Sequence, residues 1–193
     1  LLDVCYHPNL DIIVGDVRDE EFFKTQVETH DIIVPLAAIV GASACDKDKD
    51  LSLAVNQVQI ENIAKWASMN QMVLYPVTNS GYGIGQDGIY CTEDTPLNPI
   101  SHYGRTKVAG EKALLDMGNA ITFRLATVFG TAPRMRMDLL VNDFVYRAFN
   151  DRFIVLFESH FKRNYIHIRD IASVFLHAIN NYDTMKGEAY NVG

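Results

Sequence analysis

The chain has 193 residues, 48% of them hydrophobic, and a formal net charge of −7 from 17 basic and 24 acidic residues. This length and composition suit one compact α/β domain with a buried core. The acidic balance argues against a nucleic-acid-binding surface, and no apolar run approaches the roughly 20 residues of a membrane-spanning helix. Because the start also lacks the layout of a signal peptide, we expect a cytoplasmic protein without a membrane partner.

The metal-ligating residue types are scattered along the chain. The three cysteines, Cys5, Cys45 and Cys91, lie far apart, and the six histidines lack the spacing of a zinc helix. We expect free thiols in a reducing compartment and no metal site.

Predicted strands and helices alternate from the N-terminus onward. Apolar runs predict strands at 11–14, 31–36, 72–77, 121–126, 153–156 and 164–168. Helical patterns cover 20–28, 50–70, 101–117, 137–149 and 170–181. This alternation is typical of a parallel sheet covered by helices on both faces.

The opening unit of a dinucleotide-binding sheet is missing from this order. That unit is a strand, a G-x-G-x-x-G turn and a helix whose N-terminus holds the pyrophosphate. Nothing before Asp11 fits it, and the glycine-rich run at 81–85 belongs to a loop. We therefore expect a doubly wound Rossmann-type sheet whose first βα unit is absent, with both ends of the longer protein cut off.

A tyrosine and a lysine stand four residues apart in the predicted helix 101–117. Tyr103 and Lys107 would share one helix face, so the ammonium could lower the pKa of the phenol toward the range useful for proton transfer. Thr78, at the end of the preceding strand, could hydrogen-bond a substrate oxygen. Taken alone, such a pair is more often a surface pair than a site; the order strand, hydroxyl, loop, tyrosine helix favours an active site.

Eight segments of the chain resemble the extended short-chain dehydrogenase/reductases, the sugar-nucleotide epimerase/dehydratase family. They are GDVRDEE (15–21), VPLAAIVG (34–41), VNQVQIENI (55–63), TNSGYG (78–83), NPISHYGRTK (98–107), FRLATVFG (123–130), RNYIHIRDIA (163–172) and GEAYNVG (187–193). The resemblance implies a NAD-binding Rossmann domain at 1–135. It also implies a partial substrate-binding region at 136–193, interleaved with the last Rossmann elements.

The resemblance also implies where the cofactor would lie. Asp16 and Val17 would contact the adenine, and Leu36, Ala37 and Ala38 would let backbone approach the ribose. The alternatives are an ordinary turn for Asp16 and core packing for residues 36–38.

Further roles follow from the same resemblance at matching positions. Asn56 would be the buried asparagine beneath the site, or else a solvated helix residue. Tyr103 would be the general acid/base beside the nicotinamide, and Lys107 would hold the ribose hydroxyls. Thr78 would position the substrate oxygen, and Thr127 would contact substrate.

Arg163 would grip the substrate diphosphate, or else be an exposed strand residue. Related dehydratases carry an acidic residue just after the threonine, where this chain has Asn79 and Ser80, so 4,6-dehydration is disfavoured.

The resemblance implies an NAD-dependent nucleotide-sugar epimerase acting at C4, with NADP as an alternative cofactor. The alternatives are an NAD(P)H-dependent nucleotide-sugar 4-ketoreductase or dehydratase, and a non-enzymatic protein on this fold. The partner would be a nucleotide-diphosphate sugar. A homodimer through the helices at 50–70 and 101–117 is also implied, although core burial explains their apolar residues equally well.

Overall fold

The protein's computed structural model describes residues 7–85, 90–157 and 159–193, so Cys5 lies outside the described residues. Within them, one parallel sheet runs in the order β1-β2-β3-β6, formed by Ile32–Ile33, Met72–Thr78, Ala120–Leu125 and Ala189–Val192. A second parallel pair joins β4 (Thr127–Phe129) to β5 (Tyr165–His167). The parallel pairing confirms the predicted α/β fold.

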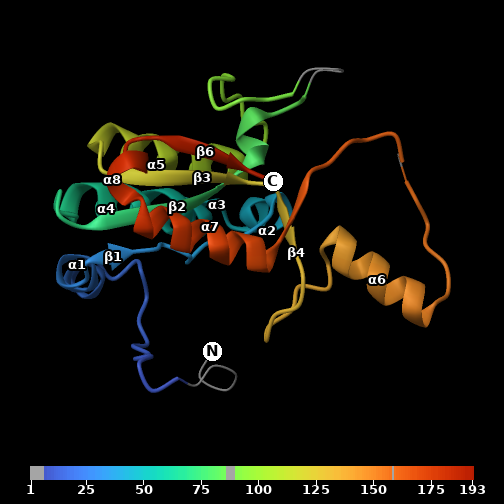
Figure 1. The fold of residues 1–193 in the computed structure, drawn as a ribbon, viewed down its shortest axis with the longest axis horizontal. Helices are drawn as coiled ribbons and strands as arrows, with labels where there is room; N and C mark the ends of the chain where they lie inside the picture. The colour runs from blue at the N-terminus through green and yellow to red at the C-terminus, as the bar shows by residue number, and fades with distance from the viewer. Residues whose placement is uncertain (1–6, 86–89, 158) are drawn as a thin grey trace.

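Helices cover both faces of the larger sheet (Figure 1). In Figure 1, α7 crosses in front of the strands, whereas α4 and α5 lie behind them. The helices are α1 (Glu20–Thr29), α2 (Ala42–Lys47), α3 (Lys49–Leu53), the π-helix η1 (Ala54–Val58), α4 (Gln59–Trp66), the 3-10 helix η2 (Asn79–Tyr82), α5 (His102–Met117), α6 (Leu140–Asn150), α7 (Ile168–Asn180) and α8 (Tyr182–Met185).

The alternation of side chains along β2 explains the two layers. Val73, Tyr75 and Val77 pack into one core with residues of α1, α4 and α5. Leu74 points to the opposite face and joins a second core with residues of α7 and α8. Since successive strand residues face opposite sides, one apolar run supplies both cores.

Two predicted strands are wrong. Residues 11–14 and 153–156 form no strand, and both segments run away from the sheets in Figure 1. A strand persists only where a neighbouring strand accepts and donates its backbone hydrogen bonds, and none of the described strands pairs with either segment. The predicted strand at 31–36 is correspondingly short, since only Ile32 and Ile33 pair with β2 at the sheet edge.

The predicted helix at 50–70 is present but is interrupted by a wider π turn at η1. Such turns occur often at functional sites, and here η1 contains Asn56. The predicted helices at 101–117 and 170–181 correspond to α5 and α7, and α6 begins three residues later than predicted. In the part of the chain that is described, no helix is long and apolar enough to cross a membrane.

Candidate active site

The site begins at the carboxyl end of β2. Thr78 is the last residue of this strand, and its hydroxyl accepts a hydrogen bond from the Ser80 amide at 3.2 Å, which caps η2. The loop before α5 packs against η2, because the Asn98 amide donates to the Gly81 carbonyl at 2.9 Å. Gly83 has φ of 77°, and a Cβ there would lie 2.2 Å from the Asn98 carbonyl oxygen. The start of α5 is therefore anchored to the end of β2.

Tyr103 lies in the first turn of α5, which Ser101 caps through its side chain. Burial raises the pKa of the Tyr103 phenol most strongly, and Cys45 adds to the increase. The nearby Thr78 hydroxyl and the charge of Arg136 lower the pKa again. The structure thus brings Tyr103 and Thr78 together, with a cation within electrostatic reach of the phenol.

Lys107 lies one turn further along α5 and is only 5% exposed. Its Nζ is 4.0 Å from the centroid of the Tyr75 ring, a cation–π contact. Burial lowers the pKa of Lys107 to about 7, and the negative charge of Glu111 opposes the decrease. The sequence predicted that Lys107 lowers the pKa of Tyr103; the largest influences that lower it in the structure are Thr78 and Arg136, and this role of Lys107 stays a prediction.

Asn56 holds the loop that follows β1. It is 1% exposed, and its Oδ1 accepts from the Ile39 amide at 2.8 Å while its Nδ2 donates to the Ile39 carbonyl at 2.9 Å. The same Nδ2 lies 3.6 Å from Cys45 Sγ. Asn56 is therefore buried rather than solvated, and it fixes the backbone just beyond the predicted ribose-contacting residues 36–38.

Gln59 was missed by the sequence analysis. It is 2% exposed on α4, one turn after Asn56, and its Nε2 donates to the Ala37 carbonyl at 2.6 Å. The loop at 36–38 is thus fixed from two helical positions. Leu36 and Ala37 are exposed and Ala38 is half-buried, so this backbone lies open at the edge of the sheet. The signal available in the sequence was a polar residue three positions after Asn56, on the same helix face.

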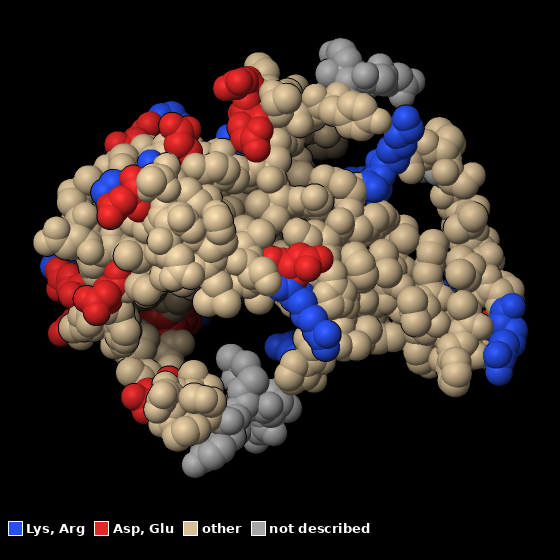
Figure 2. All heavy atoms as spheres, in the orientation of Figure 1, with Lys and Arg blue, Asp and Glu red and all other residues tan. Residues whose placement is uncertain are grey.

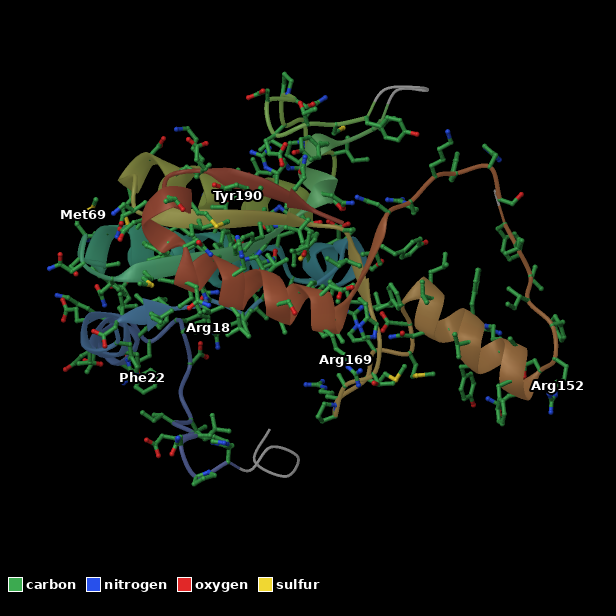
Figure 3. All side chains as sticks on the ribbon, in the orientation of Figure 1. Arg18, Phe22, Met69, Arg152, Arg169 and Tyr190 are labelled. Carbon is green, nitrogen blue, oxygen red and sulfur yellow. The ribbon has the colours of Figure 1, made fainter. Side chains whose placement is uncertain are left out.

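Asp16 and Val17 lie in the turn before α1. Asp16 forms an ion pair with Arg18, whose hydrogen bonds lower the pKa of the Asp16 carboxyl to about 2. The turn is packed tightly, since a Cβ on Gly15 would lie 2.0 Å from the ring of Phe22. Figure 3 shows Arg18 and Phe22 on this N-terminal part of the chain. The proposed adenine contact stays a prediction.

Thr127 and Arg163 lie at the start of β4 and just before β5. The Thr127 amide donates to the Asn164 carbonyl at 3.2 Å, and Thr127 pairs with Tyr165. The Asn164 side chain accepts from the Asn79 amide group at 2.6 Å. Because Asn79 follows Thr78 and Asn164 follows Arg163, these hydrogen bonds bring the predicted substrate residues to the same end of the sheets.

A buried ion pair beneath α5 was also missed. Glu111 Oε1 accepts from Thr122 Oγ1 and from Arg124 Nε, each at 2.9 Å. Another Arg124 nitrogen donates to the Tyr82 hydroxyl and to the Glu93 carbonyl, both at 2.9 Å. The signal was present in the sequence, since Glu111 follows Lys107 by four residues on one face of the helix.

A model of the "NAD dependent epimerase/dehydratase family" matches residues 4–193. The chain belongs to this family. The match covers nearly the whole chain, including every site residue described above. It confirms the resemblance inferred from the sequence motifs.

Proteins similar to this chain include a curated relative and solved structures with the same fold. The "Low-salt glycan biosynthesis protein Agl12" of Haloferax volcanii is 30% identical over 197 residues, covering 97% of this chain and 61% of that protein. A dTDP-glucose 4,6-dehydratase from Bacillus anthracis in complex with NAD superposes with a TM-score of 0.80 at 20% identity, covering 97% of this chain and 59% of that one.

A UDP-glucuronic acid 4-epimerase from Bacillus cereus, in complex with UDP-glucuronic acid and NAD, superposes with a TM-score of 0.77 at 23% identity. That superposition covers 93% of this chain and 58% of the epimerase. At these identities the two solved structures establish the common fold. The chain spans about three fifths of the length of each of these three proteins.

Proposed function

We propose that the whole protein is an NAD-dependent nucleotide-sugar epimerase acting at C4. The observation that carries this proposal is the joining of Thr78 and Tyr103 at the carboxyl end of β2, where open α/β sheets bind their ligands. Two hydroxyls that lie near each other can hold one sugar oxygen between them. Tyr103 would take the proton from that oxygen during oxidation and return it during reduction, while Thr78 keeps the oxygen in place.

The residues around Tyr103 fit a nicotinamide dinucleotide. The backbone at 36–38 is open and is held by Asn56 and Gln59. Among the described residues, the buried Lys107 ammonium has no hydrogen-bond or ion-pair partner, so its donors are available to ribose hydroxyls. The cofactor, when bound, would supply the hydride acceptor and donor; NADP fits these observations as well as NAD.

A nucleotide-diphosphate sugar is the proposed substrate, since the substrates in related structures include UDP-glucuronic acid. Arg163 is exposed and lies next to Asn164, which is bonded to the Thr78 strand end through Asn79. A guanidinium suits a diphosphate because its planar fork matches two oxygens at once. In Figure 2, single basic side chains lie on the side toward α6, and acidic ones gather mainly at the opposite end.

A 4-ketoreductase is the second candidate, because the same residues could carry out a net reduction with NAD(P)H. Dehydration is disfavoured, since the positions after Thr78 are Asn79 and Ser80 and the Asn79 amide is bonded to Asn164. Neither side chain can supply the extra proton transfer that elimination needs.

The test uses the whole protein purified without added cofactor. Denaturation should release NAD or NADH into the supernatant, and the native protein should change the C4 configuration of UDP-glucuronic acid or UDP-glucose without added cofactor. An epimerase regenerates its cofactor in each turnover, whereas a reductase consumes it. Activity only on 4-keto sugars with added NAD(P)H would overturn the epimerase and support the reductase.

We also propose a homodimer through α5 and the helical stretch from α3 to α4. These helices pack on each other, and Leu53 and Val58 remain exposed on the second of them. Replacement of Val58 by lysine should convert a dimer into a monomer in size-exclusion chromatography with light scattering. A dimer that persists in this variant would place the interface elsewhere.

A further inference from the structure

Three residues at intervals of four connect the surface end of α5 to its buried middle. Tyr103, Lys107 and Glu111 lie in one row of the helix, because residues four apart share a face. Exposure decreases along the row, to 5% at Lys107 and 1% at Glu111. The proposed site therefore continues inward from the phenol to an ammonium and then to a carboxylate.

The Glu111 carboxylate is anchored at one oxygen only. Its Oε1 accepts from Thr122 and Arg124, whereas Oε2 is buried and has no hydrogen-bond partner among the described residues. A buried carboxylate oxygen without a donor is costly unless a positive charge compensates it. Arg124 cannot turn away from Glu111 freely, because Tyr82 and the Glu93 carbonyl fix its other end.

We propose that Glu111 is a positioning residue for Lys107: its anchored carboxylate keeps the buried lysine in the charged form that the site needs. This rests on the proposed function of Lys107 at the cofactor ribose. Without an opposite charge, burial drives a lysine toward the neutral amine, which has fewer donors and no charge. Glu111 would not touch substrate or cofactor; it would act through Lys107.

The ionisable groups around Lys107 differ in burial. The elements packed against this part of α5 carry Cys45, Asp46 and Lys47 on α2, Lys49 and Asp50 on α3, Glu61 and Lys65 on α4, Tyr75 on β2, Tyr82 on η2 and Arg124 on β3, in addition to Tyr103 and Glu111 on α5 itself. The acidic and basic residues on α2, α3 and α4 are exposed, so solvent screens them. Glu111 is the group whose charge raises the pKa of Lys107.

The experiment follows the titration of Lys107 directly. In the whole protein labelled with isotopic lysine, the Lys107 signal is assigned by its absence in Lys107→Met and followed by NMR as pH is varied. Glu111→Gln keeps the shape and an acceptor oxygen but removes the charge. It should move the Lys107 titration to lower pH by about one pH unit, and the basic limb of the activity profile should move with it.

Two further variants separate charge from structure. Thr122→Val removes a hydrogen bond to Glu111 but keeps the carboxylate, so it should lower thermal stability without moving the Lys107 titration. Asp116→Asn removes an exposed carboxylate from the same helix, where it pairs with Lys112. It should change neither the thermal stability nor the Lys107 titration. If Glu111→Gln does not fold, Glu111→Gln/Arg124→Met removes both buried charges and should still move the Lys107 titration to lower pH, by a smaller amount because the loss of the Arg124 cation acts in the opposite direction.

An unchanged Lys107 titration in the folded Glu111 variant would overturn the proposal. So would an equal shift in Thr122→Val, because packing alone would then explain the effect. The titration needs no turnover, so it tests the coupling of Glu111 to Lys107 even if the activity assay rejects the epimerase. Conversely, an active epimerase with an unshifted Lys107 would refute only the role of Glu111.

Discussion

Replacement of Lys107 by methionine should change how the stability of the protein depends on pH. The pKa of Lys107 falls from its ordinary 10.5 to about 7 in the folded protein because the side chain is buried. Between these values the unfolded chain binds more protons than the folded one, so the free energy of unfolding rises with pH. With about 1.4 kcal/mol for each pKa unit, the contribution of Lys107 between pH 7 and pH 9 is an increase of about 2 kcal/mol.

The assay is urea unfolding of the whole protein at a series of pH values, compared between wild type and Lys107→Met. The variant should be more stable than wild type near pH 7, and the difference should shrink as pH rises. Lys112→Met is the matched control on the same helix, because Lys112 is exposed and pairs with Asp116 at the surface. Parallel stability curves for wild type and Lys107→Met would refute the reasoning that burial has lowered this pKa.

Two further predictions concern residues that shape the site. Asn56→Ala should lower the free energy of unfolding by about 1–3 kcal/mol and weaken NAD retention, because the two buried hydrogen bonds to the Ile39 backbone are lost. Gln57→Ala removes an exposed hydrogen bond, so the same urea titration should show a smaller decrease in the free energy of unfolding. Arg136→Met should raise the pKa of Tyr103 and move the acidic limb of the pH–rate profile to higher pH, whereas Arg134→Met should leave it in place.

The central elements of the fold could be predicted because their signals are local. The apolar run of β2 ends in a hydroxyl, and α5 begins with a capping serine just after two loop-forming prolines. Those signals also indicate which residues come together, since Thr78 ends β2 and Tyr103 lies in the first turn of α5. The order of motifs along the chain was enough to infer the family that the comparison confirmed.

Features that depend on distant partners could not be predicted. The apolar runs at 11–14 and 153–156 have the composition of strands. A strand also needs a partner strand to hydrogen-bond with, and the local sequence pattern does not show whether one lies alongside. The influence of Arg136 on Tyr103 depends on where a loop after β4 folds back. The ion pair of Glu111 with Arg124 joins a helix to a strand across the core, and its geometry appears only after folding.

The most direct test of the account replaces the phenol itself. Tyr103→Phe and the exposed control Tyr146→Phe are made in the whole protein, and epimerisation is measured at saturating nucleotide sugar without added cofactor. The account predicts that Tyr103→Phe keeps the fold and the bound NAD but loses about a hundredfold or more in kcat, whereas Tyr146→Phe behaves as wild type. Wild-type turnover by Tyr103→Phe would show that another group moves the proton and would contradict the account.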